Sequence, residues 1–290
     1  MELATSMNLL FHNNLDLEKA VDYLYNVGFR NLDFNFCDWL FESSPFLDSN
    51  WSKWLENIKK RADSLGVKFV QAHGPIFNKF DDSINKKMIE LSIRSIEGSA
   101  ILGVKWIVFE PETFPGAFDD KHLKRLKDKN IEWIEKLLKK CEEAGVGIAI
   151  ENVFDLISLS SRKCSRWYGS IPAELIDLVD SINNPLLGIC WDTGHANINN
   201  LNQYESIISL GARLKATHIQ DNNGLSDQHL LPFYGTINWK DVIRALHEIR
   251  YEGYFTYEIH NFIRPLPERI KNYGLRYIVD VGNSLINGYF

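Results

Sequence analysis

The 290-residue chain has few cysteines and no long hydrophobic run, which excludes several classes of protein. Its four cysteines, Cys37, Cys141, Cys164 and Cys190, form no C-x-x-C pair, so the sequence indicates neither a zinc knuckle nor a disulfide framework. Free thiols are typical of a reducing compartment, and we expect a cytoplasmic protein. No apolar run approaches the roughly 18 residues that a membrane span needs, and residues 1–14 lack the pattern of a signal peptide.

The chain also lacks an excess of positive charge. Its 38 acidic residues outnumber 32 basic ones, which gives a net charge of −6 at pH 7 and an isoelectric point near 5.8. Proteins that bind nucleic acid carry a basic surface that neutralises phosphates, so we do not expect a nucleic-acid partner. Hydrophobic residues make up 45% of the chain, which is typical of a globular protein with a large core.

Five segments repeat one pattern, in which a helical stretch is followed by a glycine, an apolar residue, a short apolar run and a polar residue. They span residues 26–34, 64–73, 101–110, 143–152 and 251–260. Glycine closes helices in the left-handed conformation, and the run after it suits a buried parallel strand. Residues 186–192 and 214–221 predict two more strands without the glycine, and an opening strand at residues 3–10 completes eight.

The stretches between these strands have the 3.6-residue period of amphipathic helices. In residues 51–66 and 237–249 the period places on one face Trp54, Leu55, Ile58, Ala62 and Leu65, and Trp239, Val242, Ile243, Leu246 and Ile249. Strands that alternate with helices over about 250 residues or more predict an α/β fold, a single (β/α)8 TIM barrel formed by residues 1–290 as one domain. An open doubly wound sheet normally has a Gly-rich loop after its first strand, and residues 5–14 contain none.

A titratable residue closes almost every predicted strand. These residues are Asp33, His73, Glu110, Glu151, Asp192, His218 and Glu258. In a TIM barrel the carboxyl ends of all strands meet at one rim, where barrel enzymes hold their active sites. Converging carboxylates repel one another and lose hydration, and a divalent cation offsets both costs. Histidine with carboxylates and no cysteine favours Mn, Mg, Co or Zn, so the sequence predicts a metal site at this rim.

Taken singly, these residues also have purely structural interpretations. His73 alone fits a hydrogen-bonded structural histidine, and Glu110 alone fits a helix cap or a partner of a lysine. Asp192 alone fits the N-cap of the following helix, and Asp33 is expected to support the site or the fold rather than to bind directly. The set as a whole favours a site, because independent accidents rarely place titratable groups at the ends of nearly all strands.

Four motifs in order carry a family resemblance. They are AIEN at Glu151, WDTGH at Asp192 and His195, THIQD at His218, and YEIH at Glu258. With this order and spacing the chain resembles the xylose isomerase-like TIM barrels, and more narrowly the sugar phosphate isomerase/epimerase group that includes D-tagatose 3-epimerase. Endonuclease IV shares this barrel. The resemblance covers nearly the whole chain, from GFRNLDF to YEIH.

The resemblance implies roles for individual residues. Glu151, Asp192, His218 and Glu258 would hold one divalent metal ion, and Glu151 and Glu258 would also be the catalytic pair. The substrate would be contacted by His73, His195, Glu110, Trp191, Asp227 and His229, and a further metal could be held by His195, Asp227 and His229. Trp191, Phe233 and Tyr234 would cover the apolar faces of a sugar. Glu110 stands where the endonuclease has a zinc-binding histidine, which argues against a three-zinc cluster.

We therefore expect a divalent-metal-dependent sugar or sugar-phosphate isomerase or epimerase that transfers a proton next to a ketose carbonyl through an enediolate. The alternatives are a metal-dependent phosphodiesterase of the endonuclease IV type, an inositol-type ketone dehydratase, and a metal- or sugar-binding protein without catalysis. The sequence leaves open which sugar is bound and whether it carries a phosphate, for which Asn222, Asn223 and Gly224 are weak candidates. It also leaves open whether residues 275–290 form the last barrel helix or a contact in a homo-oligomer.

Overall fold

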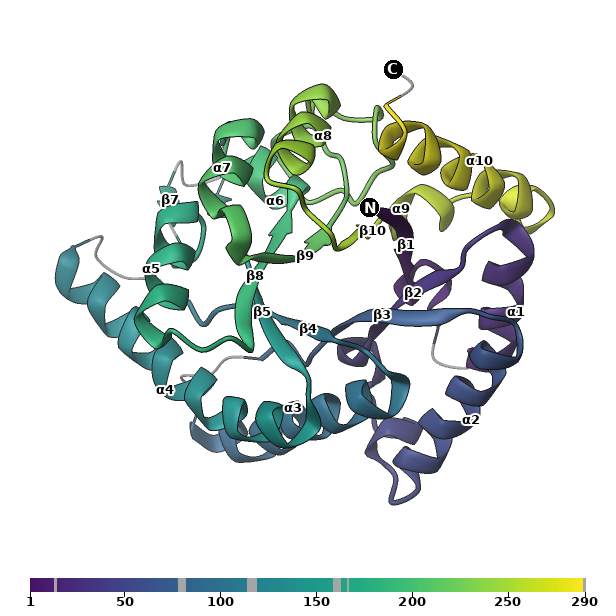
Figure 1. Ribbon diagram of the computed structural model, residues 1–290, viewed down its shortest axis with the longest axis horizontal. Coiled ribbons are helices and arrows are strands. Elements are labelled where there is room, and N and C mark those ends of the chain that lie inside the picture. Colours follow the sequence, from purple (N-terminus) through teal and green to yellow (C-terminus); the bar gives the residue numbers. More distant parts are fainter. Residues whose placement is uncertain (13–14, 78–81, 114–118, 159–162, 166, 289–290) are drawn as a thin grey trace.

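The computed structural model describes residues 1–12, 15–77, 82–113, 119–165 without 159–162, and 167–288, and it shows a barrel of strands surrounded by helices (Figure 1). The barrel strands are β1 (Glu2–Ser6), β2 (Asn31–Asn35), β3 (Lys68–His73), β4 (Trp106–Phe109), β5 (Gly147–Glu151), β8 (Leu187–Asp192), β9 (Leu214–His218) and β10 (Tyr254–Tyr257). The hydrogen-bonded order is β10-β1-β2-β3-β4-β5-β8-β9, and every pairing in it is parallel. The predicted (β/α)8 TIM barrel is therefore confirmed.

The barrel closes between β9 and β10 through residues just beyond the ends of those strands. Ile219 N donates to Thr256 O at 2.8 Å, and Glu258 N donates to Ile219 O at 3.0 Å. Ile219 and Tyr257 form an isolated parallel bridge there. This closure fixes the position of Glu258, whose backbone is one of its hydrogen-bond donors.

Helices form a ring around the strands (Figure 1). They are α1 (Leu17–Val27), α2 (Trp51–Ser64), α3 (Asp82–Leu102), α4 (Asp120–Ala144), α5 (Pro172–Ile182), α7 (Gln203–Leu210), α8 (Trp239–Glu248) and α10 (Glu268–Ile286). Shorter helices are α6 (Thr193–Ile198), α9 (His260–Ile263), and the 3₁₀ turns η1 (Met7–Leu10), η2 (Phe36–Trp39), η3 (Pro45–Leu47) and η4 (Gly211–Arg213). The predicted apolar faces of α2 and α8 are buried or half-buried against the barrel.

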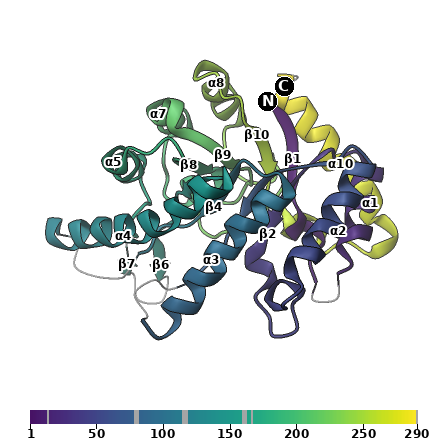
Figure 2. The ribbon, with the colours of Figure 1, turned by 60° about the horizontal axis from the view of Figure 1, so that its bottom comes forward.

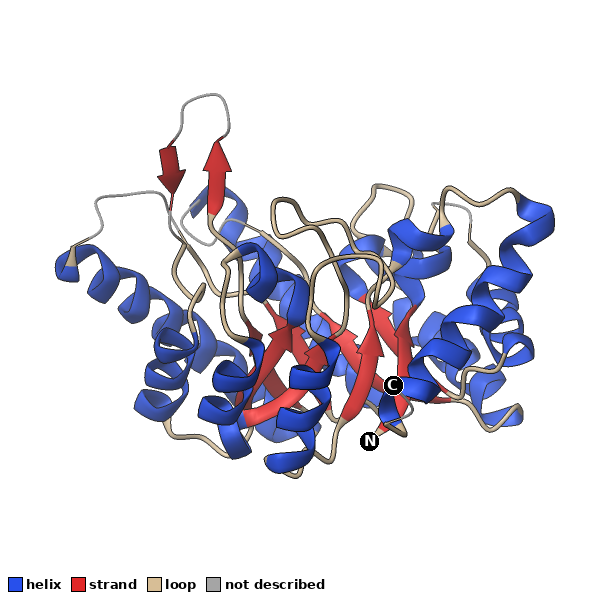
Figure 3. Ribbon diagram, turned by 90° about the horizontal axis from the view of Figure 1, so that it is seen from above, coloured by secondary structure: helices blue, strands red, loops and turns tan. Residues whose placement is uncertain are grey.

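The long loops lie on one side of the barrel. Figure 3 shows the strand arrowheads directed toward that side, where the antiparallel pair β6 (Leu156–Ser158) and β7 (Lys163–Ser165) also projects. Inside the barrel, a small cluster of Val108, Ala149, Cys190 and Ala216 fills the space between strands. The larger apolar residues pack between strands and helices. The carboxyl ends of the strands thus form the floor of the space that the loops enclose, which is where TIM-barrel enzymes hold their active sites.

The glycine pattern is confirmed at four of its five positions. Gly28, Gly66, Gly103 and Gly145 have positive φ angles of 124°, 69°, 80° and 69°, as expected of residues that follow a helix. At the fifth position the prediction is wrong, because Arg250 takes the left-handed conformation there with φ of 55°. Gly253 is required by space instead, since a Cβ would lie 2.2 Å from the Tyr251 hydroxyl oxygen.

The two ends of the chain answer two points of the sequence analysis, the length of the first strand and the structure of the C-terminal run. The first strand ends at Ser6 rather than at residue 10, because the Ser6 side chain accepts a hydrogen bond from Asn8 N and caps η1. The C-terminal run belongs to α10, the last barrel helix, which packs beside α1 and β1 (Figure 2) and buries Leu275, Ile278 and Leu285. Among the described residues, no helix combines the length and apolarity needed to cross a membrane.

Candidate active site

Four of the residues that close the strands, His73, Glu110, Glu151 and Glu258, line one cavity at the carboxyl end of the barrel. The cavity has a volume of about 360 Å³, within the range of roughly 300–1,000 Å³ that small-molecule sites have. Its described lining residues are Asn8, Asn35, Cys37, Asp38, His73, Ile76, Glu110, Glu151, His195, Asp227, His229, Glu258 and His260. Seven of these thirteen were predicted as site residues from the sequence.

Glu151, Asp192, His218 and Glu258 come together at the floor of the cavity, where Glu151 and Glu258 line it and Asp192 and His218 are buried beneath the lining. Each offers one ligand atom, and these atoms all lie within 4.8 Å of one another. His218 Nδ1 lies 2.7 Å from Glu151 Oε1 and 3.7 Å from Glu258 Oε2. The side chains of Glu151, Asp192 and His218 are almost completely buried. Three carboxylates and an imidazole in such proximity are a donor set that a divalent cation fits.

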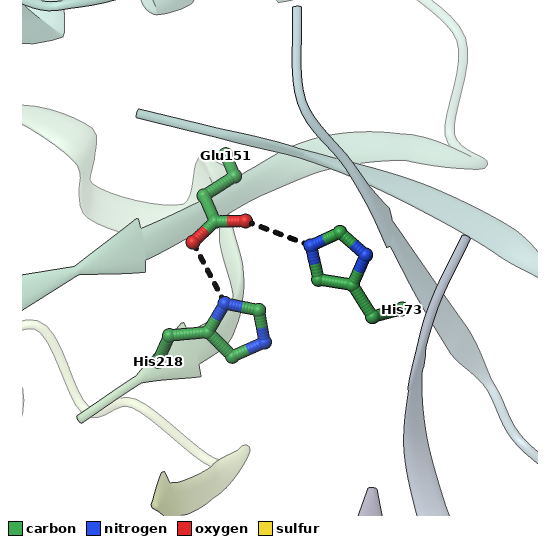
Figure 4. A group of neighbouring side chains, drawn as sticks. All are labelled: His73, Glu151 and His218. Atoms are coloured by element: carbon green, nitrogen blue, oxygen red, sulfur yellow. Dashed lines mark hydrogen bonds and ion pairs between the residues drawn. The ribbon is translucent and has the colours of Figure 1, made fainter. Parts of the chain in front are cut away.

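A second group at the floor shares Glu151 and adds His73 (Figure 4). His73 Nε2 lies 3.3 Å from Glu151 Oε2, and the imidazoles of His73 and His218 stack with ring centroids 5.5 Å apart. His73 Nδ1 donates to Gly74 O at 2.8 Å, which fixes the ring. Glu151 Oε2 is buried and forms no other polar contact with a described residue than this approach of His73 Nε2, so the oxygen has capacity for a further partner.

The charges at the floor shift the pKa values of its carboxyl groups in opposite directions. Burial opposes ionisation of Glu151, but the nearby imidazoles of His218, His73 and His195 outweigh it and hold its pKa far below the usual range. Burial raises the pKa of Asp192 to about 7, and the negative charge of Glu151 adds to this effect while His195 opposes it. A cation at this position would remove the repulsion between these two carboxylates.

Asp192 both ends β8 and caps the next helix. Its Oδ1 accepts a hydrogen bond of 2.6 Å from His195 N, so α6 begins directly at Thr193. This short helix brings His195 to the cavity, where its Nδ1 donates to Asn152 O at 2.7 Å. Asn152 also binds the backbone of Asp192 through bonds of 2.7 and 2.9 Å. The alternative N-cap interpretation of Asp192 and its place in the cluster are thus compatible.

Asp227 and His229 lie on the loop between β9 and α8, at the side of the cavity. His229 Nε2 donates to Asp227 Oδ2 at 2.8 Å, and His195 Nε2 lies 3.7 Å from the same oxygen. Burial and two neighbouring imidazoles act on the pKa of Asp227, and the imidazoles prevail and lower it. Burial opposes protonation of His229, but Asp227 and Glu258 raise its pKa to about 9. The structure therefore brings together the three residues proposed for a further metal.

Asp33 lies behind His218 rather than in the cavity. Its Oδ2 is 3.4 Å from His218 Nε2 and accepts a hydrogen bond of 3.3 Å from Gln71 Nε2. Asp33 is completely buried, and its other oxygen has no hydrogen-bond partner among the described residues. This position agrees with the expected supporting role, because a carboxylate on the far nitrogen fixes the orientation of a ligating imidazole.

Several predicted contacts lie elsewhere. Trp191 does not line the cavity, because its buried indole faces α7 and donates to Gln203 Oε1 at 3.0 Å. Phe233 and Tyr234 are about half exposed, at 56% and 52%, and are not among the lining residues. Asn222 is buried and binds the backbone of Gly194, so its side chain supports the loop rather than a phosphate. The expected contacts of these side chains with a sugar therefore receive no support from their positions.

The loops after β1 and β2 contribute a wall that the sequence did not reveal. Asn8, Asn35 and Asp38 line the cavity there, together with Cys37. Cys37, Cys141 and Cys190 form no disulfide, and the side chain of Cys164 lies outside the described part of the chain. Burial raises the pKa of Cys37, which keeps this thiol protonated. The only signal for the wall was the polar pair Asn35 and Asp38 in FNFCDW, which matches no known motif by itself.

Comparison with known proteins agrees with this architecture. The uncharacterized protein MJ1311 of Methanocaldococcus jannaschii is 27% identical over 235 residues, which are 78% of this chain and 76% of the relative. The D-psicose 3-epimerase of Enterocloster bolteae is 30% identical over 123 residues, 41% of this chain and 36% of the enzyme. The crystal structure of a D-tagatose 3-epimerase-like protein matches with a TM-score of 0.76 and 23% identity, over 100% of this chain and 99% of that chain.

A family model described as xylose isomerase-like TIM barrel matches residues 21–278. This range includes every strand of the barrel except β1 and all the residues at the cavity floor. The match extends over most of the chain, and the barrel has the architecture that the description names. The resemblance seen in the sequence is therefore confirmed, and the chain belongs to the xylose isomerase-like TIM barrel family.

Proposed function

We propose that the chain is a divalent-metal-dependent sugar isomerase or epimerase that transfers a proton next to a ketose carbonyl. The observation that carries this proposal is the cluster of Glu151, Asp192, His218 and Glu258, whose ligand atoms lie within 4.8 Å of one another beneath a cavity of about 360 Å³. The partial similarity to a D-psicose 3-epimerase supports the same class of reaction. Mn, Mg, Co and Zn all suit this donor set.

The metal would be held by the four residues of the cluster. Two observations fit this assignment, namely the buried Oε2 of Glu151, which accepts no hydrogen bond from a described residue, and the raised pKa of Asp192. A cation at the cluster would bind the first group and favour ionisation of the second. When bound, a divalent ion acts as a Lewis acid that stabilises negative charge on a substrate oxygen. The remaining chemistry is supplied by the side chains of the chain.

Glu151 and Glu258 are the proposed proton-transfer pair. They approach the cavity from different strands, because Glu151 ends β5 and Glu258 follows β10. The neighbouring imidazoles keep the Glu151 carboxylate ionised, and its place at the cavity would let it accept a proton from the carbon beside the carbonyl. Glu258 would return a proton, which yields an epimer when it is delivered to the opposite face of the same carbon. His73 and His195 would donate hydrogen bonds to substrate oxygens and hold the carbon in place.

The experiment that tests this proposal is hydrogen exchange in deuterated water. We expect purified protein with Mn²⁺ or Mg²⁺ to incorporate deuterium beside the carbonyl of at least one ketose in a panel, measured by NMR. Glu151→Gln and Glu258→Gln should each lower the exchange rate by about 10²–10⁴-fold, because the substitution removes the proton acceptor and keeps the shape.

The matched control is Glu135→Gln on the exposed face of α4, which should exchange at the wild-type rate. Far-UV circular dichroism checks that all three variants are folded. Wild-type exchange rates in both site variants would contradict the assignment of the proton-transfer pair. The absence of exchange with every ketose and every metal would contradict the proposed reaction.

One observation favours a second candidate, the metal-dependent hydrolysis of a phosphodiester. His195 Nε2 and His229 Nε2 lie 3.7 and 2.8 Å from Asp227 Oδ2 beside the floor, and we propose that a further ion would bind there as in endonuclease IV. Metal analysis and an abasic-site duplex separate the two proposals, since two or three ions per chain and strand cleavage would favour hydrolysis. A product that has lost water would instead indicate the dehydration of a ketone, which begins with the same proton transfer.

A further inference from the structure

The wall formed by Asn8, Asn35 and Asp38 lies across the barrel from Asp192, on the side where β1 pairs with β10. In the eight-stranded order, β2 stands four places from β8, so the end of β2 lies on the opposite side of the barrel from Asp192. Asn35 ends β2, Asp38 lies in η2 directly after it, and Asn8 lies in η1 after the neighbouring strand β1. A substrate that binds at the Asp192 side of the cluster and extends across the barrel, past Glu258 beside β1, would therefore reach these three residues.

Hydrogen bonds within the wall fix its side chains. Asn8 Nδ2 donates to both oxygens of Asp38, at 2.7 and 2.8 Å. Arg264 Nη2 donates to Asn8 Oδ1 at 2.9 Å, which sets the orientation of the Asn8 amide. Asn35 Oδ1 accepts from Ser6 Oγ at 2.5 Å and from Asn8 N at 3.3 Å, which sets the orientation of the second amide. The wall is thus arranged before any ligand binds, which lowers the entropic cost of binding.

Unused donors and acceptors remain at the cavity side of the wall. Each carboxylate oxygen of Asp38 accepts one hydrogen bond and has capacity for another. Asn35 is 2% exposed, and its Nδ2 donates to no described residue. Both residues line the cavity. The wall therefore presents an acceptor and a donor side by side, which is the complement of two neighbouring hydroxyl groups.

The described lining of the cavity offers an anionic ligand neither lysine nor arginine. It includes five carboxylic acids and four imidazoles, and Arg264, which donates to Asn8, is not among the lining residues. Phosphate groups in proteins are bound by arginine, lysine or backbone N–H groups, and a carboxylate such as Asp38 repels them. The end of the substrate that reaches the wall should accordingly be uncharged.

We propose that Asn8, Asn35 and Asp38 form a specificity site that binds the hydroxyl groups at the end of the substrate remote from the reacting carbon, and so select an unphosphorylated sugar. Asp38 accepts a hydrogen bond from one hydroxyl, Asn35 Nδ2 donates to the oxygen of the next, and Asn8 holds Asp38 in place. This inference rests on the proposed sugar isomerase or epimerase activity, since it assigns the substrate of the same cavity.

The test compares Asp38→Ala with wild type on a ketohexose, its terminal deoxy derivative and its terminal phosphate. For the ketohexose, Asp38→Ala should lower kcat/KM about 10–100-fold, chiefly through KM, because a hydrogen bond to a charged acceptor is lost. Wild type should lose a similar factor on the deoxy sugar, and Asp38→Ala should cause little further loss on it, because the two changes remove the same hydrogen bond. The phosphate should be the poorest substrate of wild type.

The matched control is Glu42→Ala, an exposed acidic residue on the same segment between β2 and α2, which should leave all three substrates unaffected. Equal losses on the ketohexose and the deoxy sugar in Asp38→Ala, or a preference of wild type for the phosphate, would overturn the specificity site and leave the proposed reaction intact.

A binding measurement separates the two proposals. Titration calorimetry with a hexitol, which cannot react, reports on the wall without the reaction. Hexitol binding that is weakened about tenfold or more in Asp38→Ala and unchanged in Glu42→Ala supports the wall even if no ketose shows hydrogen exchange. If Asp38→Ala and wild type bind the hexitol equally well, the proposed specificity site is wrong. If wild type neither binds the hexitol nor exchanges hydrogen in any ketose, both proposals are wrong.

Discussion

At the scale of single residues, Asp38 shows that the cavity holds a charge at a cost to stability. Burial raises the pKa of this carboxyl from 3.8 to about 6, and the donor Asn8 only partly offsets the effect. A carboxyl whose pKa is higher in the folded than in the unfolded state stabilises the fold most at low pH, and this stability is lost as pH rises through the folded pKa. Residues that destabilise their own fold in this way are common at functional sites.

We therefore predict that the stability of Asp38→Asn relative to wild type increases with pH. The neutral amide does not ionise, so the free energy of unfolding of the variant minus that of wild type should increase by about 1 kcal/mol between pH 5 and pH 8. Urea denaturation at both values measures the free energy of unfolding. Glu42→Gln is the control, because Glu42 is exposed and carries no desolvated charge. If the difference in free energy of unfolding between Asp38→Asn and wild type is constant or falls from pH 5 to pH 8, ionisation of Asp38 does not destabilise the fold.

At the scale of elements, the connection between β9 and α8 depends on a single carboxylate, Asp221. Its Oδ1 accepts from Asn222 N and Ile237 N, and its Oδ2 accepts from Phe233 N and the indole of Trp239. Asp221 is completely buried. Asp227 and His229 lie within the loop that these bonds close, so Asp221 contributes to their position without entering the cavity, together with Gln220, which bonds to both.

We predict that Asp221→Asn lowers the free energy of unfolding by about 2–4 kcal/mol. The new amide nitrogen cannot accept hydrogen bonds, so the N–H groups that face it lose their buried acceptor. Urea denaturation measures the loss. Asp241→Asn on α8 is the control, since its carboxylate is partly exposed and bonds mainly to side chains, and its loss should stay below about 1 kcal/mol. Similar losses in the two variants would mean that Asp221 does not organise the loop.

The sequence predicts the strands and their last residues better than it predicts the turns that follow them. The strands and the convergence of Glu151, Asp192, His218 and Glu258 were predictable, because hydrophobic pattern and barrel topology together determine them. The family resemblance led us to expect that Trp191 contacts substrate, but its side chain lies on the helix side of β8. Side chains alternate along a strand, so Trp191 and its neighbour Asp192 face opposite sides, and this period of two would have predicted its position. Asn8 and Asp38 were not predictable, because they lie in 3₁₀ turns where no period fixes the direction of a side chain.

At the scale of the whole molecule, the barrel brings together charges that would otherwise separate. Glu151, Asp192, His218 and Glu258 come from four strands, and each strand is fixed by its neighbours on both sides. The fold cannot relax to move one carboxylate away without disturbing the closed sheet. Binding of a cation relieves the repulsion without protonating Asp192, and it should stabilise the entire barrel rather than one loop.

We predict that Mn²⁺ or Co²⁺ raises the melting temperature of the chelator-treated protein by several degrees. A ligand at a thousand times its Kd contributes about 4 kcal/mol, and each kcal/mol corresponds to about 2–4 °C for chains of roughly this size. Differential scanning calorimetry with and without metal measures the shift. Asp192→Asn should remove most of it, because asparagine still accepts the N-cap hydrogen bond from His195 N and lacks the charge.

Asp128→Asn on the exposed face of α4 is the control for this prediction, and it should retain the full shift. A full shift in Asp192→Asn would place the ion away from the cluster. No shift in the wild-type protein with Mn, Co, Mg or Zn would contradict the metal site itself, because an ion that binds only the folded barrel must raise its melting temperature.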